Sequence, residues 1–165
     1  MIHNRQATVD DAPLIQSLAE HTWYPTYSPI ISQEQIRYML HHIYNLQLIS
    51  HQIKENEQTY LLLFEDQQPV GFAGFSPRTE NADVYKLHKL YCLVETKGKG
   101  YGKALLREVE GRVVAAGKNV LELNVNKYNP AKGFYEKQGY KVIYEEDIPI
   151  GDYWMNDFVM RKILF

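Results

Sequence analysis

The chain has 165 residues, of which 45% are hydrophobic and 23% charged, a length and composition typical of one folded domain spanning residues 1–165. Its net charge of -2 argues against the broad basic surface with which proteins hold nucleic-acid phosphates, so we expect no nucleic-acid partner. The single cysteine, Cys92, excludes an intrachain disulfide, and no apolar run is as long as a membrane span, so we expect a cytoplasmic protein without a membrane partner.

The first third of the chain predicts one strand followed by helices. The expected elements are a strand at residues 2–7 and helices around residues 14–19, 36–43 and 46–53. Thr8 to Asp11 supply side-chain oxygens that can cap the first helix. Ser32 to Gln35 have the spacing of a capping box before the second helix. Three aromatic residues, Trp23, Tyr24 and Tyr27, fall in the segment that we expect between these two helices.

The rest of the chain predicts mostly strands. The expected strands lie at residues 60–64, 70–75, 84–93, 120–125, 140–144 and 158–163, and the expected helices at residues 104–116 and 130–138. Glu65 to Pro69 have a turn-forming composition, so the first two of these strands are predicted to form an antiparallel hairpin. This order of elements predicts an α/β or α+β fold in which helices cover both faces of a mixed sheet.

A glycine-rich segment connects the predicted strand at residues 84–93 to the helix that follows. Its glycines are Gly98, Gly100 and Gly102, and its lysines are Lys97, Lys99 and Lys103. The first N–H groups of a helix lack internal partners and carry partial positive charge, so phosphate oxygens are suitable ligands there. A tight connection with solvated lysines is the alternative. The spacing matches neither a Walker A loop nor a dinucleotide fingerprint, which disfavours an ATPase or a kinase.

Two segments of the chain carry a family resemblance. The first is Leu90-Tyr91-Cys92-Leu93 followed by Lys97-x-x-Gly100-x-Gly102. The second runs from Leu123-Asn124-Val125-Asn126 through Asn129-Pro130-Ala131 and Phe134-Tyr135 to Gly139-Tyr140. In this order they resemble motifs A and B of the GNAT superfamily of acetyl-CoA-dependent N-acetyltransferases. Lys97 stands where the family usually has Gln or Arg, and it keeps a hydrogen-bond donor there.

The resemblance implies a mostly antiparallel central sheet whose two central strands splay apart, with acetyl-CoA as the co-substrate. The implied cofactor-binding residues are Leu90, Tyr91, Cys92, Lys97, Gly98, Lys99, Gly100, Tyr101, Gly102, Lys103 and Asn129. The backbone of the glycine-rich segment would hold the pyrophosphate, and the main chain from Leu90 to Cys92 would pair with the pantetheine arm. Asn129 would bond the cofactor, cap the next helix, or do both. We interpret Cys92 as a packed residue rather than a nucleophile, and we expect no metal.

Acetyl transfer to an amine needs a proton acceptor for the amine and a proton donor for the departing sulfur. Tyr135 stands where the family places its general acid, and the alternative is an aromatic residue of the core. His88 is the candidate base, and strand alternation places it on one face with Lys86 and Leu90. The alternatives are a structural or substrate-lining role for His88, a weaker candidate in Glu122, and deprotonation through water.

The acceptor amine is less constrained. The predicted acceptor-binding residues are Trp23, Tyr24, Tyr27 and Tyr85, the last also a weaker candidate for the base. Five carboxylates between the predicted closing strands suit a polycation: Glu145, Glu146, Asp147, Asp152 and Asp157. The segment from Gly151 to Lys162 resembles the bacterial spermidine/spermine acetyltransferase branch, so a polyamine is the leading acceptor. A protein lysine or N-terminal acetyltransferase and a non-catalytic coenzyme A-binding regulator are the alternatives, and a homodimer is compatible with either.

Overall fold

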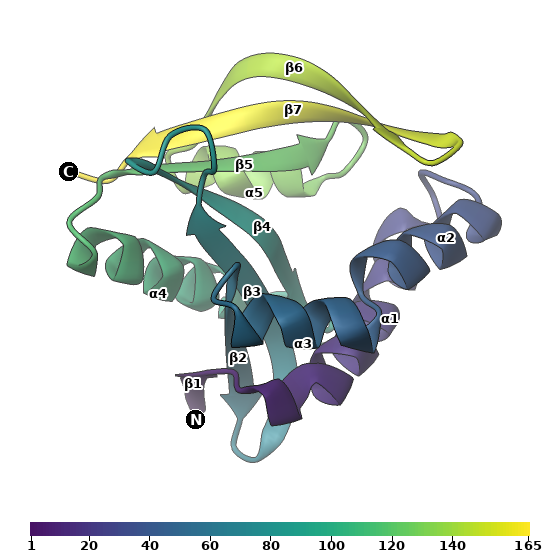
Figure 1. The fold of residues 1–165 in the computed structure, drawn as a ribbon, viewed down its shortest axis with the longest axis horizontal. Helices are drawn as coiled ribbons and strands as arrows, with labels where there is room; N and C mark the ends of the chain where they lie inside the picture. The colour runs from purple at the N-terminus through teal and green to yellow at the C-terminus, as the bar shows by residue number, and fades with distance from the viewer.

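The computed structural model describes all 165 residues and shows a mixed α/β fold built on one seven-stranded sheet (Figure 1). The strands are β1 (Ile2–Gln6), β2 (Thr59–Glu65), β3 (Gln68–Pro77), β4 (Val84–Cys92), β5 (Val120–Asn126), β6 (Lys141–Ile150) and β7 (Tyr153–Ile163). They lie in the order β1-β2-β3-β4-β5-β7-β6, and every neighbouring pair is antiparallel except β4 and β5. The predicted mixed, mostly antiparallel sheet is confirmed.

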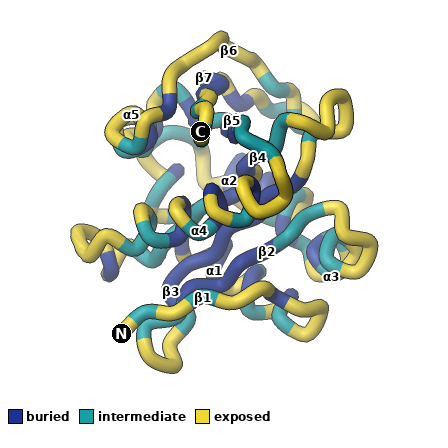
Figure 2. Tube along the Cα trace, turned by 90° about the vertical axis from the view of Figure 1, so that its left-hand side faces the viewer, coloured by how far each residue is buried: buried dark blue, intermediate teal, exposed yellow.

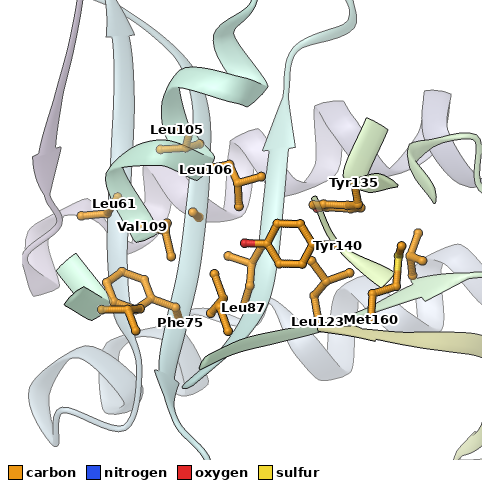
Figure 3. Close-up of a cluster of buried hydrophobic side chains, with 14 of the residues drawn as sticks. Leu61, Phe75, Leu87, Leu105, Leu106, Val109, Leu123, Tyr135, Tyr140 and Met160 are labelled. Atoms are coloured by element: carbon orange, nitrogen blue, oxygen red, sulfur yellow. The ribbon is translucent and has the colours of Figure 1, made fainter. Parts of the chain in front are cut away.

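Helices cover both faces of the sheet, as predicted. They are α1 (Ala12–Tyr27), α2 (Gln33–Ile43), α3 (Leu46–Lys54), α4 (Tyr101–Ala115) and α5 (Ala131–Lys137). On one face, α4 and α5 pack on β3, β4 and β5 through residues such as Leu105 and Val109, which are fully buried (Figure 3). On the other face, α1, α2 and α3 enclose a second core that includes Ile36 and Phe72. Strands β2 and β3 therefore lie between two apolar layers and are buried along most of their length (Figure 2).

The parallel pair β4 and β5 separates partway along its length. Pairing runs from Val84 opposite Val120 to Leu87 opposite Leu123, after which β4 continues to Cys92 and β5 to Asn126 without contact through hydrogen bonds. In Figure 1, β2 to β4 run down the molecule while β5, β7 and β6 cross its top. This divergence is the splaying that the family resemblance implied, and it leaves a gap in the middle of the sheet.

The first helix extends further than the sequence predicts. Helix α1 continues through Pro25 to Tyr27, so Trp23, Tyr24 and Tyr27 are helical and do not lie between two helices. The apolar face around Trp23 and Tyr27 is buried against α2, α3 and the sheet, and this packing outweighs the backbone hydrogen bond that proline cannot make.

The two closing strands are also longer than predicted, and this changes the position of the acidic residues. Glu145, Glu146 and Asp147 lie in β6 and Asp157 lies in β7, while Asp152 alone occupies the turn. Strand β6 is the edge of the sheet and is exposed along most of its length, so its sequence lacks the apolar alternation of a half-buried strand. The expectation that all five carboxylates lie between the closing strands was therefore wrong, because four of them belong to the strands of the hairpin.

Candidate active site

A β-bulge at His88 sets the direction of the side chains that enter the gap. In the pairing of β3 with β4, Gly74 lies opposite Lys89 and Phe75 lies opposite Leu87, so His88 is an extra residue without a partner. The bulge reverses the alternation, because Leu87 and Leu90 both pack on the α4 side while Tyr91 packs on the α1 side. The expectation that His88 shares one face with Leu90 was therefore wrong.

The bulge is followed by backbone groups that point into the gap. The N–H of Leu93 donates to the carbonyl of Val70 at 2.8 Å, which makes this pair of residues a hydrogen-bonded one in the antiparallel ladder. Hydrogen-bonded and non-bonded pairs alternate, so the N–H and C=O groups of Cys92 and Leu90 turn away from β3. They face the side from which β5 has departed, and an extended ligand can pair with them as an additional strand.

The glycine-rich segment between β4 and α4 carries a row of unused hydrogen-bond donors. Gly98 has φ +88° and Gly100, at the start of α4, has φ +79°, conformations that favour glycine. No protein acceptor bonds the backbone N–H groups of Gly98, Gly100, Tyr101, Gly102 and Lys103. A Cβ placed on Gly98 or Gly100 would meet no atom within 4 Å, and all five residues line an open pocket. A helix N-terminus with this many free donors fits a diphosphate.

The lysines of this segment differ in their contacts. Lys99 Nζ lies 3.2 Å from Glu65 Oε2, and the Tyr101 hydroxyl donates to the same carboxylate. These two hydrogen bonds, with that of Tyr101 the stronger influence, lower the pKa of Glu65. Lys97 and Lys103 form no ion pair and line the open space beside the segment. Their ammonium groups are available to an anionic ligand, whereas that of Lys99 is already paired.

Three adjoining pockets follow the gap. A loop pocket of about 730 Å³ lies against the glycine-rich segment and reaches Leu90, Cys92 and Asn129. A central pocket of about 190 Å³ lies between β4 and β5 and shares those three residues with the loop pocket. A third, the β7 pocket, of about 390 Å³, adjoins the central pocket through residues that include His88 and Asn124. The loop and β7 pockets have no lining residue in common, so the central pocket is the junction between them.

Tyr135 and Cys92 line the central pocket. The Tyr135 hydroxyl has no hydrogen-bond partner, and its ring packs on Phe134 and Tyr140, with centroids 5.1 and 5.8 Å away. Burial raises the pKa of Tyr135, so the phenol carries its proton at neutral pH. Burial also raises the pKa of the Cys92 thiol to about 12, which keeps it from ionising to a nucleophilic thiolate. The arrangement offers one proton donor at the junction.

Asn129 stands at the boundary between the loop and central pockets. Its side-chain Oδ1 accepts a hydrogen bond from the N–H of Ala131, the first residue of α5, at 2.9 Å. Its Nδ2 lies near the Tyr27 hydroxyl, and the residue lines both pockets. The side chain therefore orders the start of α5 and leaves one donor for a ligand.

Two basic side chains of β4 reach the junction. His88 accepts or donates a hydrogen bond of 2.7 Å between its Nε2 and Ser76 Oγ, and its Nδ1 is free. Desolvation in the gap and the neighbouring Lys89 and Lys86 lower the pKa of His88, so the ring is neutral at pH 7. The Lys89 ammonium is buried and bonds Tyr60 Oη at 2.7 Å, with no carboxylate partner. Burial lowers the pKa of Lys89 to about 7.

The alternation of β4 does not identify Lys89 as a residue of the site. Lys89 follows His88 in a strand of otherwise alternating polar and apolar residues, where a lysine is expected to point to solvent. The bulge turns it inward instead, to where Gln58 Oε1 also accepts from its Nζ at 3.0 Å. In the sequence, the one indication of this role was a lysine within a strand predicted to lie in the core.

The structure separates the predicted acceptor-binding residues. Tyr27 lines the central and β7 pockets, and its hydroxyl shares a hydrogen bond of 2.9 Å with that of Tyr91. Trp23 is one helical turn away and also lines the β7 pocket. Tyr24 lies on another face of α1, toward α2, and Tyr85 packs on Phe75 beside α4. Neither lines the gap, because helical and strand periodicity direct both side chains elsewhere.

Glu122, a weaker candidate for the base, forms ion pairs with two arginines instead. Its carboxylate is buried and accepts from Arg78 Nη1 at 3.1 Å and from Arg161 Nε at 2.6 Å. It lies opposite Lys86 and Arg161 in the sheet, one residue before β4 and β5 separate. The side chains of Glu122, Arg78 and Arg161 thus link β5 to its neighbours at the edge of the gap. Both oxygens of Glu122 are occupied, so neither is free to take a proton.

Comparison with known proteins agrees with this geometry. Residues 27–162 match the family model of the acetyltransferase (GNAT) domain. The chain is 28% identical over 98% of its length to a spermidine N(1)-acetyltransferase of Thermoplasma acidophilum, of which it covers 96%. A crystal structure of paia N-acetyltransferase from the same organism, in complex with coenzyme A, superimposes with a TM-score of 0.85 at 28% identity, covering 99% of both chains.

A further structure extends the likeness in fold. The structure of yncA from Salmonella typhimurium with its cofactor acetyl-CoA has a TM-score of 0.75 at 16% identity, and covers all of this chain and 95% of that one. Three findings lead to one assignment: the central strands diverge, a helix N-terminus carries open donors, and the family model matches most of the chain. This chain belongs to the GNAT family of acetyl-CoA-dependent N-acetyltransferases.

Proposed function

We propose that residues 1–165 form a single catalytic domain that transfers the acetyl group of acetyl-CoA to a primary amine, with a polyamine as the preferred acceptor. The observation that carries the proposal is the row of five unbonded N–H groups at the start of α4, which adjoins a pocket leading to an unpartnered tyrosine hydroxyl. The likeness to a spermidine N(1)-acetyltransferase supports the choice of acceptor.

The donor would occupy the loop and central pockets. The N–H groups of residues 98 and 100–103 would hold the diphosphate, with Lys97 and Lys103 adding positive charge. The free peptide groups of Leu90 and the C=O of Cys92 would pair with the pantetheine arm. Asn129 Nδ2 would donate where the loop pocket meets the central pocket. The thioester then lies at the junction, and it supplies the activated acyl group.

Direct attack by the amine requires three groups from the chain: a donor for the carbonyl oxygen, a proton donor for the sulfur, and a proton acceptor for the amine. The N–H of Cys92 would donate to the carbonyl oxygen as negative charge develops on it. The Tyr135 hydroxyl would give its proton to the departing sulfur, a role for which a protonated phenol without another partner is suited. The protonated Cys92 thiol supports direct transfer without an acetylated cysteine.

The proton of the amine would pass to His88. The ring is neutral at pH 7, its Nδ1 has no partner, and it lines both the central and β7 pockets. Its hydrogen bond with Ser76 holds the ring in place. Because the lowered pKa makes His88 a weak base, the transfer would go on to solvent through the open side of the gap.

The test is the release of coenzyme A thiol from acetyl-CoA in the presence of candidate acceptors. We expect release with spermidine, spermine and short diamines, at a rate well above hydrolysis without an amine. Release only with lysine peptides or free N-terminal amines would replace the polyamine by a protein acceptor. Tight acetyl-CoA binding without release under any condition would replace the enzyme by a coenzyme A-binding regulator.

A further inference from the structure

Asp157 has the only fully buried side-chain nitrogen or oxygen atom in the chain that lacks a hydrogen-bond partner. The residue is 6% exposed, and the unpartnered atom is its Oδ1. The other oxygen, Oδ2, accepts from Asn124 Nδ2 at 3.2 Å. Leaving a buried carboxylate oxygen unpaired costs free energy, and burial raises the pKa of Asp157 accordingly. A cation in front of Oδ1 would remove this cost.

The position of Asp157 relates it to the acceptor and not to the reacting bond. It lies in β7 opposite Asn126 of β5, and it lines the β7 pocket together with apolar residues Ile148 and Met155. It does not line the central pocket, whereas its hydrogen-bonded neighbour Asn124 lines both. The carboxylate therefore borders the β7 pocket but not the central pocket, where the reacting bond would lie.

The other charged groups of the β7 pocket restrict where a ligand cation can bind. Lys86 and Lys89 enter from β4, Lys89 next to Tyr44 and Gln58 and Lys86 nearer the hairpin. Neither lysine forms an ion pair with Asp157, whose Oδ1 remains free. A ligand ammonium is repelled by both lysines, of which Lys86 lies close enough to Asp157 for the two charges to interact. Asp157 is the only carboxylate that lines the pocket, so the favourable position for a ligand cation is beside it.

We propose that Asp157 binds the non-reacting ammonium of a diamine or polyamine acceptor and so directs the other amine into the central pocket. The inference rests on the proposed function, because it takes the junction as the place of the acetyl group. It makes Asp157 a specificity-determining residue. A monoamine of equal length would lack this contact, and the two kinds of acceptor would differ by the strength of one charge-assisted hydrogen bond.

The test compares 1,4-diaminobutane with 1-aminobutane as acceptors for the wild-type protein and for Asp157→Asn, which keeps the shape of the side chain. We expect the wild type to prefer the diamine, and the variant to lose about tenfold or more in kcat/KM for the diamine and little for the monoamine. Equal losses for both amines, or an unchanged preference for the diamine, would overturn the proposal.

Asp147→Asn is the matched control. Asp147 lies in β6 of the same hairpin, is exposed, accepts from Asn156 Nδ2 at 2.7 Å, and does not line the β7 pocket. This variant removes the same charge and should keep the preference for the diamine. If it weakens the diamine as much as Asp157→Asn does, a diffuse acidic surface attracts the acceptor and the role of Asp157 is refuted.

A binding measurement separates this inference from the proposed function. Calorimetry of 1,4-diaminobutane with the coenzyme A-bound protein should show binding that Asp157→Asn weakens about tenfold or more. That result with no thiol release from acetyl-CoA would support the ammonium site while refuting the transferase. Undiminished binding to the variant would refute the ammonium site while release from acetyl-CoA continues. If Asp157→Asn is unstable, Asp157→Ser serves in the same comparison.

Discussion

Replacing Gly100 by alanine tests whether the start of α4 holds the donor. Gly100 has φ +79°, and an alanine there adopts the left-handed conformation at a cost of about 1 kcal/mol. A Cβ at this position meets nothing within 4 Å, so no steric clash with the protein adds to that cost. We expect the melting temperature of Gly100→Ala to fall by about 2–4 °C, as a loss of this size gives in a protein of this length.

Gly117 provides a matched control at the opposite end of the same helix. It has φ +81° and open space around its Cβ position, and it lies far along the chain from the loop pocket, which it does not line. Gly117→Ala should therefore lose a similar amount of stability. Differential scanning calorimetry of the two variants measures this shared effect of backbone strain, which can then be set aside.

The two variants should differ in their affinity for coenzyme A. In Gly100→Ala the new methyl group stands among the N–H donors, and losing one charge-assisted hydrogen bond to a phosphate costs about 1.5–3 kcal/mol. The dissociation constant measured by isothermal titration calorimetry should rise about 10- to 100-fold, and that of Gly117→Ala should stay within about twofold of wild type. Equal affinities of the two variants would refute the placement of the diphosphate.

Three further variants test the junction and the sheet around it. Tyr135→Phe should lower kcat by roughly 10² with an unchanged dissociation constant for coenzyme A, and an unchanged kcat would leave Tyr135 with a packing role only. The pKa of Lys89 is lowered to about 7 in the folded protein, so above pH 7 the unfolded chain binds more protons than the folded one. The free energy of unfolding of the wild type, measured in urea, should therefore rise relative to that of Lys89→Met by on the order of 2 kcal/mol between pH 7 and 9. Parallel stabilities over that range would contradict a buried ammonium. Glu122→Gln should cost roughly 2–3 kcal/mol in the same assay because it leaves Arg161 without a charged partner, whereas the more exposed Glu108→Gln should cost less than about 0.5 kcal/mol.

Much of the fold follows from short-range sequence patterns and could be predicted from them. Ser32 accepts from the N–H of Gln35 at 3.0 Å, as the capping box indicated, and residues 59–77 form the expected hairpin. The glycine-rich segment lies between a strand and a helix, as its composition and neighbours indicated. These features depend on neighbours within a few positions, which is the range over which propensity and spacing act.

The features that could not be predicted depend on partners distant in sequence. The bulge at His88 is defined by its register with β3 and cannot be read from β4 alone. The inward position of Lys89 follows from that bulge and from Tyr60, which precedes it by 29 positions. The length of β6 follows from pairing with β7, since an exposed edge strand has no apolar period. The unpaired oxygen of Asp157 became recognisable only when its neighbours were in place.

The separation between the loop and β7 pockets has a consequence for how such a protein can change over time. Because the two have no wall residue in common, substitutions that reshape one need not disturb the other. If the β7 pocket holds the acceptor, as proposed, mutations on α2, β6 and β7 can change the amine that is modified while the thioester remains bound as before. The same separation is useful for protein engineering, because a mutant library confined to the β7 pocket would vary acceptor selectivity while the loop pocket stays unchanged.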